Sequence, residues 1–217
     1  MTISYRLGWT FFRISYALYF RARFFNPERV PRKGPAILAS NHASFLDPPL
    51  VGIGLPRGIN YMARDSLFRF PILGSILRSW EAVPVDRDGG GAAGLRQIMD
   101  RLARGGVVLL FPEGTRSRDG ALQAPRTGIG LLVAKSSAPV IPVRVFGTLA
   151  AYSRHHPIPR PTPISVKYGR PLAFAELRAE SLDCSKPRLK EIYAEIAQEL
   201  MTAIGNLEPC EDRAEFP

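Results

Sequence analysis

The amino-acid sequence predicts an α/β fold, in which a mixed and mostly parallel sheet is flanked by helices. Short apolar runs alternate with segments whose apolar residues recur every three or four positions, which is the pattern of strands followed by helices. The chain of 217 residues is long enough to bury a core within a single domain. Two cysteines, Cys184 and Cys210, are too few for a disulfide framework, so we expect a reducing cytosol.

Residues 1–30 are predicted to form an amphipathic helix at a membrane interface, ahead of a main domain at residues 31–217. One helix face carries the apolar side chains Ile3, Leu7, Phe11, Ile14 and Leu18. Internal arginines interrupt the segment, so we expect it to lie in the interface and not to span the bilayer. A helix packed on the protein's own core is the alternative, because amphipathicity indicates only that something apolar covers that face.

The remaining elements follow from local pattern and from turn residues. Strands are expected at residues 36–40, 59–63, 82–85, 107–111, 140–146 and 164–168. Helices are expected at residues 47–55, 67–78, 92–104, 129–136 and 186–204. Asp47 followed by Pro48 is the arrangement of a helix N-cap and a first-turn proline. The continuous apolar run at 107–110 predicts a central strand that is buried on both faces.

The formal charge of +10 is unevenly distributed along the chain. Residues 174–217 hold 5 basic and 10 acidic side chains, which leaves 24 basic and 9 acidic side chains in residues 1–173. Such a field attracts nucleic acid, anionic lipid or phosphorylated small molecules. No zinc finger, helix-turn-helix or aromatic RNA-binding motif is present in the sequence, so nucleic acid is not an expected partner.

The candidate chemistry begins in residues 41–47, in the loop that leaves the first predicted strand of the main domain. His42 and Asp47 can reach each other if this loop folds back on itself. The carboxylate would then fix one tautomer of the imidazole, and the other ring nitrogen could accept a proton from a hydroxyl group. For His42 alone, a hydrogen-bonded structural histidine is the competing interpretation.

Two further motifs follow predicted strands and carry anion-binding side chains. The segment Glu113, Gly114, Thr115 and Arg116 offers a hydroxyl, a guanidinium fork and a glycine that lets the backbone approach a ligand. Arg87 ends another strand segment, at residues 83–87. Because neighbouring parallel strands end at the same edge of a sheet, Arg87 and Arg116 are expected to converge on one anion.

A glycine pattern suggests an alternative from another class of protein. Residues 89–94 fit Gly-x-Gly-x-x-Gly, and Glu113 stands near the spacing of a ribose-binding acid, as in dinucleotide-binding oxidoreductases. Asp86 and Asp88 would, however, bring carboxylates close to the pyrophosphate. The glycine pattern alone is a weak signal, so this interpretation ranks second.

Taken together, the motifs resemble those of the glycerolipid acyltransferase family, specifically the 1-acylglycerol-3-phosphate acyltransferases, over residues 36–147. His42 and Asp47 match the family's His-x-x-x-x-Asp motif, and residues 113–116 match its Glu-Gly-Thr-Arg motif. Arg87 matches the arginine-bearing motif, and residues 140–143 match the final proline motif. All four motifs occur in the family's order, which is a strong signal.

The resemblance implies acyl transfer from acyl-CoA or an acyl carrier protein to the free hydroxyl of 1-acylglycerol 3-phosphate, which makes phosphatidate. Another lyso-lipid or glycerol 3-phosphate is an alternative acceptor. His42 would remove the proton and Asp47 would orient the ring, while Arg87 and residues 113–116 would bind substrate. Within that segment, Glu113 would orient Arg116 or the loop and would not react. Pro142 would line a groove for the acyl chain, or belong to a core or edge strand without a direct role.

No metal or cofactor is implied by this resemblance. The expected partners are a lysophospholipid, the acyl donor and an anionic membrane surface, with the protein peripheral on the cytoplasmic face of the membrane. A non-catalytic module that binds anionic lipid through the same basic face is the further alternative. It predicts phosphate affinity that survives the loss of His42.

Overall fold

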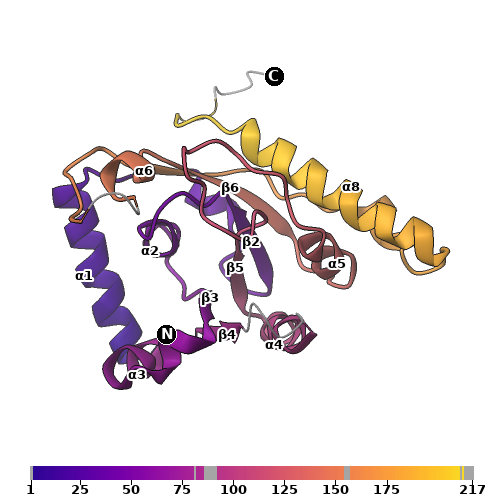
Figure 1. Ribbon diagram of the computed structural model, residues 1–217, viewed down its shortest axis with the longest axis horizontal. Coiled ribbons are helices and arrows are strands. Elements are labelled where there is room, and N and C mark those ends of the chain that lie inside the picture. Colours follow the sequence, from indigo (N-terminus) through magenta and orange to yellow (C-terminus); the bar gives the residue numbers. More distant parts are fainter. Residues whose placement is uncertain (1, 81, 86–91, 154–156, 211, 213–217) are drawn as a thin grey trace.

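One mixed sheet of seven strands runs through the described part of the computed structural model (Figure 1). The structure describes the chain except for residues 1, 81, 86–91, 154–156, 211 and 213–217. In their spatial order, the strands are β1 (Arg23–Phe25), β7 (Ser165–Tyr168), β6 (Val140–Phe146), β2 (Ala36–Ser40), β5 (Val107–Leu110), β3 (Asn60–Arg64) and β4 (Val83–Val85). The β6–β7 pair is antiparallel and the other pairs are parallel. The predicted fold class is therefore confirmed.

The helices connect these strands and cover both faces of the sheet. They are α1 (Ile3–Tyr19), α2 (Asp47–Ile53), α3 (Pro71–Ser79), α4 (Ala92–Ala103), α5 (Gly128–Ala134), α6 (Thr148–Ala151), α7 (Ala175–Glu180) and α8 (Lys186–Gly205), with the short 3-10 helices η1 (Pro27–Arg29) and η2 (Asp65–Arg69). The helix predicted at residues 67–78 is divided into η2 and α3. Pro71 lies in the first turn of α3, where its missing N–H costs no hydrogen bond.

Side chains of alternating strand residues build two cores on opposite faces of the sheet. Leu38 of β2 points into a core that α1 and α2 cover, whereas Ile37 points into a core that α4, α5 and α8 cover. Both strands beside β2 are parallel to it, and all five residues of β2 are buried. Figure 1 shows the result, with α1 and α8 on opposite sides of the sheet. The loop that leaves β2 therefore starts from the rigid centre of the molecule.

Helix α1 packs on the protein with a different face from the one that its apolar stripe suggested. Tyr5 and Tyr16 are buried, while the predicted stripe is 55–80% exposed. That stripe consists of Ile3, Leu7, Phe11, Ile14 and Leu18. The helix thus has two apolar faces, one inside and one outside. No helix in the described ranges has the length and apolar character needed to cross a bilayer.

The N-terminal helix that was predicted within residues 1–30 ends at Tyr19. Arg21 has a positive φ of 49°, which breaks the helix after its C-cap Phe20. Residues of β1 then pair with β7, so the segment joins the sheet edge. The short strand was missed because its three residues continue the apolar run of the helix.

Candidate active site

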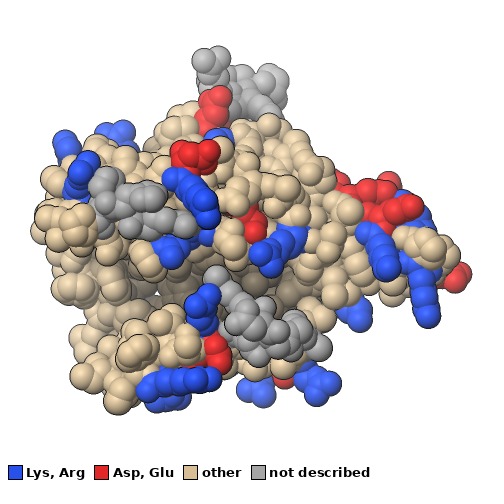
Figure 2. All heavy atoms as spheres, viewed as in Figure 1, with Lys and Arg blue, Asp and Glu red and all other residues tan. Residues whose placement is uncertain are grey.

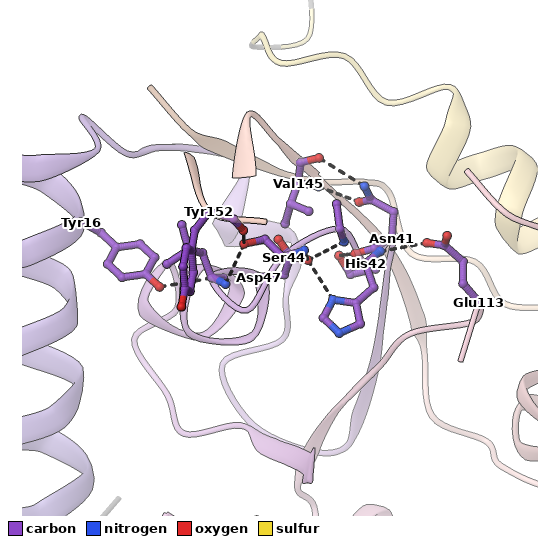
Figure 3. Close-up of polar contacts among 11 residues, drawn as sticks. Tyr16, Asn41, His42, Ser44, Asp47, Glu113, Val145 and Tyr152 are labelled. Atoms are coloured by element: carbon purple, nitrogen blue, oxygen red, sulfur yellow. Dashed lines mark hydrogen bonds and ion pairs between the residues drawn. The ribbon is translucent and has the colours of Figure 1, made fainter. Parts of the chain in front are cut away.

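The loop between β2 and α2 folds back so that His42 meets Asp47 (Figure 3). Asp47 Oδ2 lies 2.8 Å from His42 Nδ1, and it also accepts the backbone N–H groups of Ala43 and Ser44, each at 2.7 Å. The predicted contact between histidine and carboxylate is therefore present. One carboxylate oxygen fixes both the imidazole and the turn that carries it.

Asp47 does not cap α2 in the predicted way. The N-cap residue is Leu46, and the carboxylate points back to the loop and not to the first N–H groups of the helix. The Asp47 side chain is completely buried, and Tyr16 of α1 lies close by, with its hydroxyl donating to the Leu46 carbonyl at 3.3 Å. Burial and the negative charge of Asp47 both raise the pKa of Tyr16 well above its ordinary value, so the hydroxyl stays protonated.

The His42 ring packs on Phe111 and also borders an open cavity. Its side chain is 13% exposed, and it stacks on the Phe111 ring with centroids 3.9 Å apart and planes 17° apart. With Asp47 ionised, Nδ1 carries the proton that it donates to the carboxylate, and Nε2 keeps a lone pair. Stacking and hydrogen bonding thus hold a basic nitrogen in one orientation.

Asn41 and Ser44 fasten the same loop to the neighbouring part of the sheet. The Asn41 side-chain oxygen accepts the N–H of Val145 at 2.8 Å, and its amide donates to the Val145 carbonyl at 3.3 Å. The Ser44 hydroxyl donates to the carbonyl of Tyr152. These anchors were not assigned from the sequence, although the polar residues beside His42 in a buried loop were a signal for them.

Glu113 supports the loop and does not face the cavity. The side chain is 4% exposed, and its two carboxylate oxygens accept the backbone N–H groups of His42 at 2.8 Å and Gln123 at 3.1 Å. Burial raises the pKa of the Glu113 carboxyl above its ordinary value, and the two backbone donors oppose this. The contacts agree with the expectation that Glu113 orients the loop, whereas direct substrate contact by Glu113 needs correction, because the carboxylate is already occupied by backbone groups.

Gly114 has a backbone conformation that favours glycine. Its φ is +70°, and a Cβ atom there would lie 2.5 Å from Nε of Arg126. Its N–H donates to the Phe111 carbonyl at 2.9 Å, so this group is not available as an oxyanion donor in this conformation. The next two residues, Thr115 and Arg116, do line the cavity beside His42.

A cavity of about 980 Å³ extends from His42 to the inner face of α1. Figure 2 shows a hollow on this face of the molecule, with Lys and Arg atoms on its rim. The end near α1 is aromatic, and its lining includes Tyr5, Trp9, Phe12 and Trp80. The cavity therefore joins a polar end at His42 to an apolar end, which suits a molecule with a charged head and an alkyl tail.

Three arginines and one acid lie at the polar end of this cavity within the described residues: Arg64, Arg116, Arg118 and Asp119. The Arg116 guanidinium lies 3.6 Å from the centroid of the Phe45 ring, which holds it beside the opening. Arg64 and Arg118 were missed from the sequence. Arg64 ends β3, so the rule that placed the other site residues at strand ends was a signal for it.

The other two predicted residues are Arg87 and Pro142. Arg87 lies outside the described residues, just after β4, whose Val85 pairs with Arg64. Pro142 is buried in β6 between β2 and β7, so the prediction of an acyl groove there is wrong and its alternative of a core strand holds. No group of three or more His, Cys, Asp or Glu residues that could hold a metal ion occurs in the described ranges.

The matching family model and the relatives found by comparison with known proteins all carry acyltransferase names. The family model described as Acyltransferase matches residues 21–146. A 1-acyl-sn-glycerol-3-phosphate acyltransferase of Limnanthes douglasii is 30% identical over 164 residues, which is 74% of this chain and 58% of that protein. The enzyme of the same name from Bacillus subtilis (strain 168) is 32% identical over 127 residues, or 58% of this chain and 62% of that protein. The chain thus spans less than two thirds of the length of either relative.

A solved structure has the same fold. The crystal structure of the 1-acyl-sn-glycerophosphate (LPA) acyltransferase PlsC from Thermotoga maritima superposes with a TM-score of 0.71 at 21% identity. The match covers 94% of this chain and 80% of that one. Because the family model covers more than half of the chain, from the end of α1 to β6, and includes both His42 and Asp47, the chain belongs to the Acyltransferase family.

Proposed function

We propose that this chain transfers a fatty acyl group from a thioester donor to the free hydroxyl of 1-acylglycerol 3-phosphate, which makes phosphatidate. The donor is acyl-CoA or an acyl carrier protein. The observation that carries the proposal is the contact between His42 and Asp47 at the polar end of a cavity that arginines line. The named activities of the relatives support the same assignment.

The chemistry needs one base and no enzyme nucleophile. His42 Nε2 accepts the proton of the acceptor hydroxyl while that oxygen attacks the thioester carbonyl carbon. A carbon–oxygen bond forms, the carbon–sulfur bond breaks, and the proton passes from His42 to the leaving thiolate. Asp47 stabilises the imidazolium that exists between the two proton transfers.

The arginines bind the phosphate of the acceptor and position its hydroxyl. Arg116 and its neighbours Arg64 and Arg118 form a cationic rim for the phosphate of the acceptor. Arg87 remains a predicted member of this group. A phosphate held there would keep the hydroxyl near Nε2, and such positioning is worth several kcal/mol of barrier in general.

The apolar parts of the site suggest where the lipid comes from. The aromatic end of the cavity is suited to an acyl chain, and the outer face of α1 continues into exposed residues of α3, such as Ile72 at 79%. We place this surface at a membrane, as a peripheral contact. The cytoplasmic side is the setting that two free cysteines favour.

An acyl-transfer assay tests the proposed function directly. Wild type and His42→Ala are compared with both donor types and with lysophosphatidate, glycerol 3-phosphate and other lyso-lipids as acceptors. Wild type should prefer lysophosphatidate, and His42→Ala should lose about a hundredfold to ten-thousandfold in rate while it keeps the native fold, as checked by circular dichroism. A near-normal rate in His42→Ala would remove the base from the mechanism. No transfer by wild type, with lipid affinity retained in the variant, would favour the non-catalytic module.

The role of Arg116 is tested by two substitutions. Arg116→Ala should raise the KM for lysophosphatidate, while Arg116→Lys should keep part of the affinity because it keeps the charge but loses the fork. The KM for the acyl donor should change little in both. An unchanged dependence on acceptor concentration would contradict phosphate binding by Arg116.

A further inference from the structure

A second hollow, of about 920 Å³, lies at the opposite edge of the sheet from His42. Its lining includes Gly34, Asn60 and Gly106, which stand at or just before the first residues of β2, β3 and β5. His42 follows the last residue of β2, so the basic lining of the hollow and His42 lie at opposite ends of the same strands. The mechanism proposed above makes no use of this second hollow.

Five basic side chains line this hollow, and no acidic residue of the described chain does. They are Arg6, Arg32, Lys33, Arg57 and Arg104. Arg57 is bonded to the carbonyl oxygens of Pro31 at 2.7 Å, Gly34 at 2.9 Å and Gly105 at 2.9 Å. It therefore ties together the loops that form the wall of the hollow.

The other four cations have no counter-charge among the residues that the structure describes. Within the described residues, Arg6, Arg32, Lys33 and Arg104 make no side-chain hydrogen bond or ion pair, whereas Arg29, Lys167 and Arg188 elsewhere all have acidic partners. Like charges around one hollow repel each other. A bound anion would relieve this repulsion and would satisfy several guanidinium donors at once.

The surroundings of the hollow point to a lipid anion. Arg6 and Thr10 line it from α1 and stand one turn apart on that helix. Ile3 and Leu7, on the adjoining face of the same helix, are 80% and 67% exposed. An anion held beside this apolar face is best satisfied if it carries apolar tails of its own.

We infer that this hollow binds the phosphate headgroup of an anionic membrane phospholipid, separately from the acceptor that lies beside His42. The inference rests on the membrane location given under the proposed function. Tyr5, Trp9 and Trp80 line both this hollow and the catalytic cavity, so they form a shared wall. Trp9 and Trp80 are also the two tryptophans of the chain, so their fluorescence reports on occupation of the hollow.

Vesicle flotation provides the test, with two variants that lose the same charge. Arg6→Gln/Lys33→Gln/Arg104→Gln changes the hollow. Lys135→Gln/Lys186→Gln/Lys190→Gln removes three exposed cations from the C-cap of α5 and from α8, on the other face of the sheet. Each protein is mixed with vesicles of phosphatidylcholine alone or with added phosphatidylglycerol, at one fixed salt concentration.

Partition of wild type should rise strongly with phosphatidylglycerol. The hollow variant should lose about a hundredfold of this partition, since each cation near an anionic surface contributes roughly fivefold, and the control variant should stay close to wild type. Equal losses in both variants would mean that only the overall charge matters and would overturn the inference. Equal binding of wild type to neutral and anionic vesicles would overturn it as well.

A titration separates a lipid headgroup from a free anion. Short-chain phosphatidylglycerol, below its critical micelle concentration, should change the tryptophan fluorescence of wild type saturably and that of the hollow variant weakly. Inorganic phosphate that saturates the same change at equal concentration would overturn the lipid assignment. Acyl transfer by wild type in neutral detergent is measured separately, so failure of the proposed function is distinguishable from failure of the headgroup site.

Discussion

Helices α1 and α8 have similar apolar spacing and opposite surroundings. In α8, the residues that recur every four positions, Ile192, Ile196, Leu200 and Ile204, are all 0% exposed. In α1, the equally regular stripe that contains Leu7 is exposed. Figure 1 shows that both helices lie along the sheet, one on each side.

The difference in exposure comes from the side chains on the face of each helix that lies opposite its apolar stripe. The outer face of α8 is charged, with Arg188 paired to Glu180, Glu191 and Glu195. The inner side of α1 is aromatic instead, so α1 already packs well without its aliphatic stripe. The periodicity of a sequence identifies an apolar stripe on a helix, but it does not show whether the protein's own core covers that stripe.

The largest expected difference is in stability. Ile196→Ala in α8 should lower the free energy of unfolding by about 2–5 kcal/mol, because it leaves a cavity in a packed core. Leu7→Ala in α1 should change it by less than about 0.5 kcal/mol, as is usual for exposed sites. Urea denaturation of both variants checks this. Similar losses in the two variants would mean that the exposed stripe is also covered by protein.

The next effect concerns lipid binding. Leu7→Ser should lower partition of the protein to vesicles about tenfold to a hundredfold, because burial of a large apolar side chain contributes about 1.5–3 kcal/mol. Leu182→Ser is the matched control, since Leu182 is 86% exposed and lies between α7 and α8. If flotation falls equally for both variants, then α1 is not the lipid-binding element.

A smaller effect is expected on the inner face of α1. Tyr16→Phe removes the hydrogen bond to the Leu46 carbonyl and should lower the free energy of unfolding by about 1 kcal/mol. Tyr19→Phe, which removes an exposed bond to the Pro159 carbonyl, is the control and should have less effect. Thermal denaturation compares them, and a larger loss in Tyr19→Phe would contradict the importance of the buried contact.

The smallest expected effect concerns the segment that follows α8. Hydrogen bonds from Lys167 and Arg29 hold the pKa of Asp212 at about 2, below its ordinary value of 3.8. Because the folded-state pKa is lowered, this stabilisation is complete above the ordinary value and is lost as the pH falls towards the folded value.

Asp212→Asn tests this pH dependence. The free energy of unfolding of the variant should fall slightly below that of wild type at neutral pH, and the two should converge between about pH 4 and about pH 2. Because Asp212 is 41% exposed, solvent screens the interaction and the difference stays small. A difference between the two proteins that is constant across this range would show that the carboxylate charge is not responsible.

Much of the fold and the central contact of the site could be predicted from sequence. The strands and helices of the main domain follow local apolar patterns, which do not depend on distant residues. The contact of His42 with Asp47 followed from their short separation, because only one loop had to fold back. The two backbone partners of Glu113, at His42 and Gln123, could not be predicted, because they come from separate loops.

The sequence by itself determined the alternation of strands and helices, the order of the family motifs and the pairing of His42 with Asp47, since each depends on neighbours along the chain. Tertiary structure alone decided which face of α1 is covered, where Arg64 lies and how Arg57 gathers separate loops into a second hollow. These features depend on distances between segments that are far apart in sequence, and only packing around the sheet sets those distances.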